Sequence, residues 1–119
     1  MATRVGSPEP LLEATLSPYF QGGVLVTHHD NVNTTRRVTW MRAMGATIQE
    51  QPMTVVNLGA ALVEASAIGS TVYGRYADGS LRKATGITNT VEMGDVVRLV
   101  GDGKHIVWAK DDGTIRRCS

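Results

Sequence analysis

The stretches TVYGRYADGSLRKA (71–84) and VVRLVGDGKHIVWA (96–109) decide the fold of this chain. In each stretch, a run rich in β-branched, aromatic or other apolar residues leads into an Asp-Gly pair, and a second such run follows. An Asp-Gly pair between two strand-like runs predicts a β-hairpin, because glycine takes the positive φ angle that the turn needs. We predict hairpin turns at three such pairs: Asp78-Gly79, Asp102-Gly103 and Asp112-Gly113.

The strand after the second turn carries one of the two tryptophans of the chain. Ile106 and Trp108 alternate on one face of this strand, as core residues do in a half-buried sheet. We therefore predict that Trp108 lies in the core, packed with Val97, Leu99 and Ile106 or with their cross-strand partners.

Length and composition favour one mainly β domain. The chain has 119 residues, enough for a single core, and 42% of them are hydrophobic, which argues against disorder. Abundant Thr and Val, together with 13 glycines, favour short strands and tight turns. We expect a small antiparallel β-barrel or sandwich with an extended N-terminal arm.

The net charge and the cysteine content argue against several kinds of binding site and cross-link. The 12 basic and 11 acidic residues leave a net charge of +1, which is too small for broad electrostatic binding of nucleic acid. The single cysteine, Cys118, excludes an intrachain disulfide and a cysteine-rich zinc site.

The first half of the domain has weaker patterns. Residues 36–42 suit a strand, since Val38 and Trp40 alternate, although a short helix is an alternative there. Residues 54–58 and 61–65 suit two strands flanking Gly59, with a helix over 60–67 as the competing interpretation. Two further strands are predicted over residues 23–28 and 46–49.

Residues 1–23 are expected to form the arm, and residues 24–119 the β domain, with the barrel clearest over 54–115. Pro8, Pro10 and Pro18 interrupt any regular element, and Gly22-Gly23 provides a hinge. The arm carries too much apolar surface to leave in water, so we expect it to dock on another copy of the chain. The side chains predicted at this subunit interface are Leu11, Leu12, Leu16, Tyr19 and Phe20.

Neither a secretory signal nor a membrane span is expected. The first ten residues contain no apolar core of a signal peptide. The most apolar stretch, residues 53–68, is interrupted by Asn57, Glu64 and Ser66 and is too short to cross a bilayer. We expect synthesis in a cytoplasm and no membrane partner.

Few residues suggest chemistry. His28 and Asp30 lie on one face of a strand end and would need a third ligand to hold a metal ion, so we predict a polar strand end and no metal site. Cys118 lies beside the chain end, and His105 lies on a hairpin strand. No nucleophile–base pair or phosphate-binding loop is evident. We therefore predict no catalytic residues, no cofactor and no enzyme activity.

One run resembles a known class of protein. Gly94-Asp95 enters the strand 96–100, which turns at Asp102-Gly103 and returns through the aromatic strand 106–108, downstream of the Tyr-rich strand 73–76. This arrangement, over residues 54–115, resembles the small OB-like barrels of minor tail and baseplate proteins of long-tailed bacteriophages. It is also similar to other small phage virion proteins, including capsid decoration proteins.

The resemblance implies a structural virion subunit of the tail tip, baseplate or neck. Such a subunit is made in the host cytoplasm and assembles with its own copies and with other virion proteins. A capsid decoration (cement) protein is the alternative within this class.

A module that binds single-stranded nucleic acid is the alternative outside it. OB-like barrels bind single strands through aromatic residues and a basic groove, and Tyr73, Tyr76 and Trp108 are candidates for stacking. Acidic residues match the nearby arginines, so we expect no nucleic-acid partner.

Overall fold

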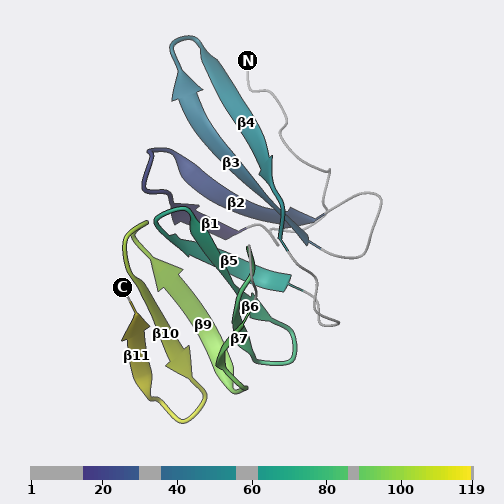
Figure 1. Ribbon diagram of the computed structural model, residues 1–119, viewed down its shortest axis with the longest axis vertical. Coiled ribbons are helices and arrows are strands. Elements are labelled where there is room, and N and C mark those ends of the chain that lie inside the picture. The colour runs from purple at the N-terminus through teal and green to yellow at the C-terminus, as the bar shows by residue number, and fades with distance from the viewer. Residues whose placement is uncertain (1–14, 30–35, 56–61, 86–88, 119) are drawn as a thin grey trace.

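The structure is a computed structural model that describes residues 15–29, 36–55, 62–85 and 89–118. Within these ranges every regular element is a strand, and all the strand pairings within the sheets are antiparallel. The strands form three sheets, which Figure 1 shows from the β3–β4 hairpin at one end to the sheet of β9, β10 and β11 at the other. The predicted fold class, a mainly β chain built as a small barrel or sandwich, is confirmed.

The first sheet has the order β1-β2-β3-β4. Its strands are β1 (Thr15–Pro18), β2 (Val24–His29), β3 (Arg36–Met44) and β4 (Thr47–Met53). The expected arm therefore needs correction, because Thr15–Pro18 pairs with β2 in the domain's own sheet. Pro18 does not end the regular structure, because proline is tolerated on an edge strand such as β1.

The β3–β4 hairpin also differs from expectation. The short helix considered for residues 36–42 is wrong, and the short strand predicted at 46–49 is part of a longer strand that includes Pro52. Pro52 is on β4, the edge strand, opposite Thr39 of β3. At an edge, the missing N–H of proline need not interrupt the hydrogen bonds between strands. Gly45 makes the tight turn with a φ of 62°.

The second sheet has the order β5-β6-β7-β8, with β5 (Leu62–Ile68), β6 (Thr71–Tyr76), β7 (Leu81–Lys83) and β8 (Thr90–Glu92). The helix considered for residues 60–67 is wrong over its described part, which is strand β5. Thr54 and Val55 lie in no strand, and the rest of the strand predicted at 54–58 lies outside the described residues. The turn at Asp78-Gly79 is confirmed, with a Gly79 φ of 83°.

The third sheet has the order β11-β10-β9, with β9 (Val96–Gly101), β10 (Ile106–Lys110) and β11 (Ile115–Cys118). Both predicted turns are confirmed, since Gly103 and Gly113 have φ angles of 93° and 89°. The third sheet lies against β5, because Ile68 at the end of β5 forms a bridge with Gly103.

Two apolar clusters fill the interior. One joins the first sheet to β5 and β6 and includes Tyr19, Leu25 and Trp40. The other lies between the third sheet and β7, and includes Leu99, Ile106 and Trp108. The predicted burial of Trp108 is confirmed, because only 5% of the residue is exposed.

Val97 was predicted beside Trp108, and this is wrong. The register of β9 and β10 shifts between Ala109 and Lys110, so that Lys110 faces Val96. Val96 therefore fills the core position, and Val97 is 49% exposed. A bulge of this kind reverses the faces of the residues beyond it, which an alternation rule cannot foresee.

Candidate functional site

The residues predicted at a subunit interface do not share one environment. Leu11 and Leu12 lie outside the described residues. Leu16 is 70% exposed and Phe20 is 41% exposed, so the interface assignment of these two side chains stays a prediction. Tyr19 is buried, with its ring centroid 5.1 Å from that of Trp40, so its assignment to the subunit interface is wrong. An aromatic ring next to the domain's own tryptophan is covered by the fold itself.

The turn between β1 and β2 holds Leu16 and Phe20 in place. Trp40 Nε1 donates a hydrogen bond of 2.7 Å to the carbonyl of Gly22, and Gly22 N donates one of 3.0 Å to the carbonyl of Tyr19. Gly103 lies directly against this turn, since a Cβ built on it would be 2.9 Å from Phe20 N. Three segments that are distant in sequence therefore fix the start of the described chain.

A groove of about 550 Å³ opens where β1, β5 and β9 come together. Each of these strands is the first or last strand of its sheet. Ser17 Oγ on β1 and Ser66 Oγ on β5 are hydrogen-bonded at 2.7 Å, which ties the first sheet to the second beside the groove. The groove is lined by Thr15, Leu16, Ser17, Glu64, Ala65, Arg98, Leu99, Val100 and Gly101.

Glu64 is the buried charged residue of this groove. Its Oε1 accepts a hydrogen bond from the backbone N–H of Leu99, and Arg75 Nε lies 3.2 Å from the same oxygen. The Arg75 Nε–H makes no hydrogen bond within the described residues, so the contact with Glu64 is an ion pair. This arrangement compensates the carboxylate and links β5, β6 and β9, as a buried charge requires.

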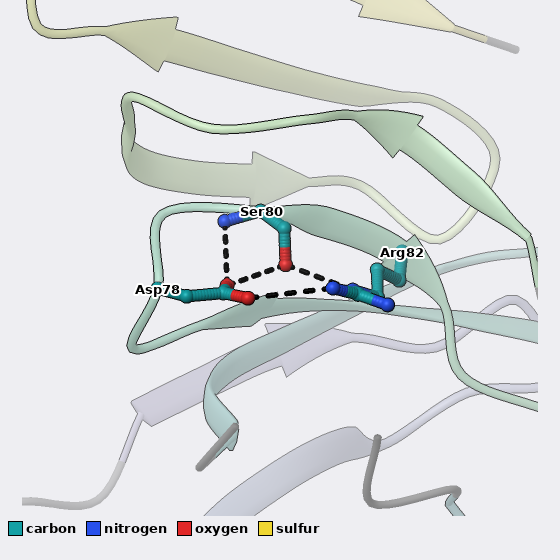
Figure 2. Close-up of polar contacts among 3 residues, drawn as sticks. All are labelled: Asp78, Ser80 and Arg82. Carbon is teal, nitrogen blue, oxygen red and sulfur yellow. Dashed lines mark hydrogen bonds and ion pairs between the residues drawn. The ribbon is translucent and has the colours of Figure 1, made fainter. Parts of the chain in front are cut away.

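A second polar cluster lies in the β6–β7 turn (Figure 2). Ser80 donates from its backbone N, at 2.9 Å, and from its Oγ, at 2.6 Å, to Asp78 Oδ1. Arg82 Nε donates to Ser80 Oγ at 2.9 Å, and Arg82 Nη2 lies 3.3 Å from Asp78 Oδ2. The hydrogen bonds from Ser80, with a smaller contribution from Arg82, hold the pKa of Asp78 below its usual value. A carboxylate with a lowered pKa is a weak base, so the cluster fixes the turn and does not activate the serine.

The histidines predicted to lie outside any metal site have ordinary polar partners. His28 Nε2 and Thr39 Oγ1 share a hydrogen bond of 2.8 Å between β2 and β3. His105 Nδ1 lies 3.3 Å from Asp102 Oδ2 in the exposed β9–β10 turn. Asp30 lies outside the described residues. The part of the chain that the structure describes holds no cluster of three or more potential metal ligands.

The candidates for base stacking are mostly inside the fold. Tyr76 is 1% exposed, and Trp108 donates from Nε1 to Glu92 Oε1 at 3.3 Å. Burial raises the pKa of Tyr76 and that of Tyr73, which packs against the second cluster. Bases cannot stack on rings that the core already covers.

Glu92 on β8 forms ion pairs with two cationic side chains of the third sheet. Arg116 Nη1 lies 2.9 Å from Glu92 Oε1, and Lys110 Nζ lies 3.4 Å from Oε2. Desolvation raises the pKa of Glu92, but the Trp108 hydrogen bond and these two charges outweigh it, and the pKa lies below its usual value. These two ion pairs tie β10 and β11 to β8.

Large apolar side chains on the surface are the feature that sequence reasoning missed. Ile48 on β4, Val100 on β9 and Ile115 on β11 are each more than half exposed. A signal existed for Ile48, because an isolated apolar residue in the otherwise polar TIQEQ has no alternating partner to form a buried face.

No protein-family model, curated protein or solved structure matches this chain. Among the described residues, no helix is long and apolar enough to span a membrane.

Proposed function

We propose that this chain is a structural, non-enzymatic protein of a tailed-bacteriophage virion, made in the host cytoplasm and assembled through contacts between subunits in the tail tip, baseplate or neck. The exposure of large apolar side chains on open strands carries the proposal. Monomeric proteins usually protect their sheet edges and keep apolar patches small. A subunit that is covered by its neighbours in an assembly has no such need.

The groove between β1 and β9 supports this role. Its walls are edge strands, and Leu16 projects from one of them with most of its surface in water. An extended segment can add to an open edge through main-chain hydrogen bonds, while pockets beside the edge select its side chains.

The test is self-association, compared with nucleic-acid binding. Sedimentation velocity of the full chain over a wide range of concentrations should show discrete oligomers that grow with concentration. Leu16→Ser should weaken this association without lowering the melting temperature, because the side chain is exposed. Lys104→Ser, on an exposed turn, is the control and should associate like the parent.

Two results would contradict the proposal. One is a chain that stays monomeric at every concentration. The other is a monomer that binds labelled single-stranded DNA in a manner that weakens with salt, which would favour the nucleic-acid module instead. Mass spectrometry of purified particles of the source phage should in addition detect the chain as a stoichiometric component.

A further inference from the structure

The β3–β4 hairpin extends beyond the sheet that supports it. β2 pairs with β3 only as far as Met41, opposite Val24, whereas β3 and β4 stay paired out to Met44 and Thr47. Residues 42–49 are therefore a two-stranded ribbon, and nearly all of them are exposed. Figure 1 shows this ribbon projecting at the end of the molecule opposite to β9, β10 and β11. A two-stranded ribbon is only marginally stable in water unless something covers it.

One side of the ribbon is apolar with a single acid. Ala43 lies directly opposite Ile48, and Met41 lies opposite Glu50, so the four side chains share a face. Ile48 is 60% exposed, and Ala43 and Glu50 are also exposed. The other side of the ribbon continues the face on which Trp40 packs in the core. We call the side formed by Met41, Ala43, Ile48 and Glu50 the tip face.

The third sheet carries a complementary surface. Across its strands, Val100 lies opposite Val107, which lies opposite Arg117, and Arg98 lies opposite Ala109, which lies opposite Ile115. The opposite side of this sheet packs Leu99 and Trp108 into the core, so these six residues face outward. Val100 is 51% and Ile115 is 63% exposed. We call this surface, formed by Arg98, Val100, Val107, Ala109, Ile115 and Arg117, the C-terminal face.

We infer that the tip face of one copy docks on the C-terminal face of the next copy of this chain. The inference rests on the proposed structural function and names the partner. Both faces are apolar at their centres, and the acid Glu50 on one meets the bases Arg98 and Arg117 on the other. Complementary charge of this kind selects the partner and sets the register of the contact.

The position of the two faces decides the kind of assembly. They lie at opposite ends of a molecule that measures 44 × 29 × 27 Å, so one copy cannot satisfy both within itself. Each copy offers one tip face and one C-terminal face, which makes the contact head-to-tail. A head-to-tail contact produces a ring if the rotation closes and a filament if it does not.

The test is a charge-reversal cycle on the full chain, followed by sedimentation velocity. Glu50→Arg, Arg98→Glu and Arg117→Glu should each lower the association constant by about tenfold or more, because each places like charges together. Glu50→Arg combined with Arg98→Glu or with Arg117→Glu should restore association towards the parent value in at least one combination. Lys104→Glu, an equal charge change outside both faces, should leave association unchanged.

The outcomes separate this inference from the proposed function. Thermal unfolding of each variant should match the parent, since all the altered side chains are exposed. If the parent associates while the three single variants behave like Lys104→Glu, or if neither combination recovers association, the docking inference is wrong and the structural function stands. If the parent does not associate at any concentration, both fall.

Discussion

Adding one methyl group at Gly103 tests how closely this residue packs against the turn between β1 and β2, which we call the N-terminal turn. Its φ of 93° suits glycine, and a Cβ there would lie 2.9 Å from Phe20 N and 3.0 Å from Tyr19 C. Both atoms are backbone, so neither can move aside by rotating a side chain. The carbonyl of Gly103 also accepts a hydrogen bond of 3.0 Å from Gly69 N, which restrains the turn from the other side.

Gly113 is the matched control. Its φ of 89° is nearly the same, and a Cβ there would have no heavy atom within 4 Å. Gly113→Ala therefore pays only for the backbone conformation, about 1–2 kcal/mol. Gly103→Ala has the same conformational cost and in addition pushes away the backbone of Tyr19 and Phe20, which adds about 1–3 kcal/mol. We expect Gly103→Ala to cost about 2–5 kcal/mol in total, a large part of a small domain's stability.

Urea unfolding followed by far-ultraviolet circular dichroism measures both free energies. The expected result is that Gly103→Ala loses clearly more free energy of unfolding than Gly113→Ala, with Gly103→Val worse still. Equal losses in the two alanine variants would show that the Tyr19–Phe20 backbone does not press on Gly103, and the argument for a fixed N-terminal turn would fail.

Four further outcomes are expected. Trp108→Ala should cost about 3–5 kcal/mol, and in a variant without the other tryptophan its emission should be blue-shifted, whereas a fully hydrated spectrum would contradict burial. Thr27→Val should stabilise the fold by about 1 kcal/mol in urea unfolding, because the buried Thr27 hydroxyl has no hydrogen-bond partner among the described residues. Backbone hydrogen bonds from the β9–β10 turn lower the pKa of Asp102 from 3.8 to about 2. The stabilisation that the ionised Asp102 provides is therefore present above pH 3.8 and is lost as the pH falls through about 2. Asp102→Asn should make the free energy of unfolding depend less on pH between these two values. A chain that begins at Gly23 lacks β1 and the buried Tyr19, so its free energy of unfolding should fall by about 3 kcal/mol or more in urea or thermal unfolding. Unchanged stability would show that residues 15–22 are independent of the domain.

Local patterns were sufficient for the hairpins of the second half. Each Asp-Gly turn depends on a backbone preference of one glycine and on the apolar runs beside it, and Gly79, Gly103 and Gly113 all have positive φ. The burial of Trp108 followed from alternation within its own strand, which holds as long as the register has no irregularity. Such features depend on neighbours in sequence and need no knowledge of the rest of the fold.

The hairpin of β3 and β4 was predicted poorly because no local sequence pattern accounts for its strand β4. TIQEQPM has no alternation of apolar and polar residues, and both its faces are exposed. Pairing with β3 makes it a strand, and its place at the edge of the sheet accommodates Pro52. Its role in the proposed head-to-tail contact was therefore invisible until the register placed Ile48 and Glu50 on one face.

Turn geometry and strand alternation are local properties, so the order of amino acids was enough to predict a mainly β domain with tight glycine turns and a buried tryptophan. Which apolar residues are covered depends instead on how the three sheets pack against one another. The same short segment contains the apolar residues Leu16, Tyr19 and Phe20. Tyr19 packs against Trp40 and is buried, whereas the other two are exposed. Val96 and Val97 are identical residues, and a bulge in their own strand buries the first and exposes the second. Burial depends on what the other strands bring to each position, so the exposed faces on which the proposed assembly rests emerge only when the three sheets are in place.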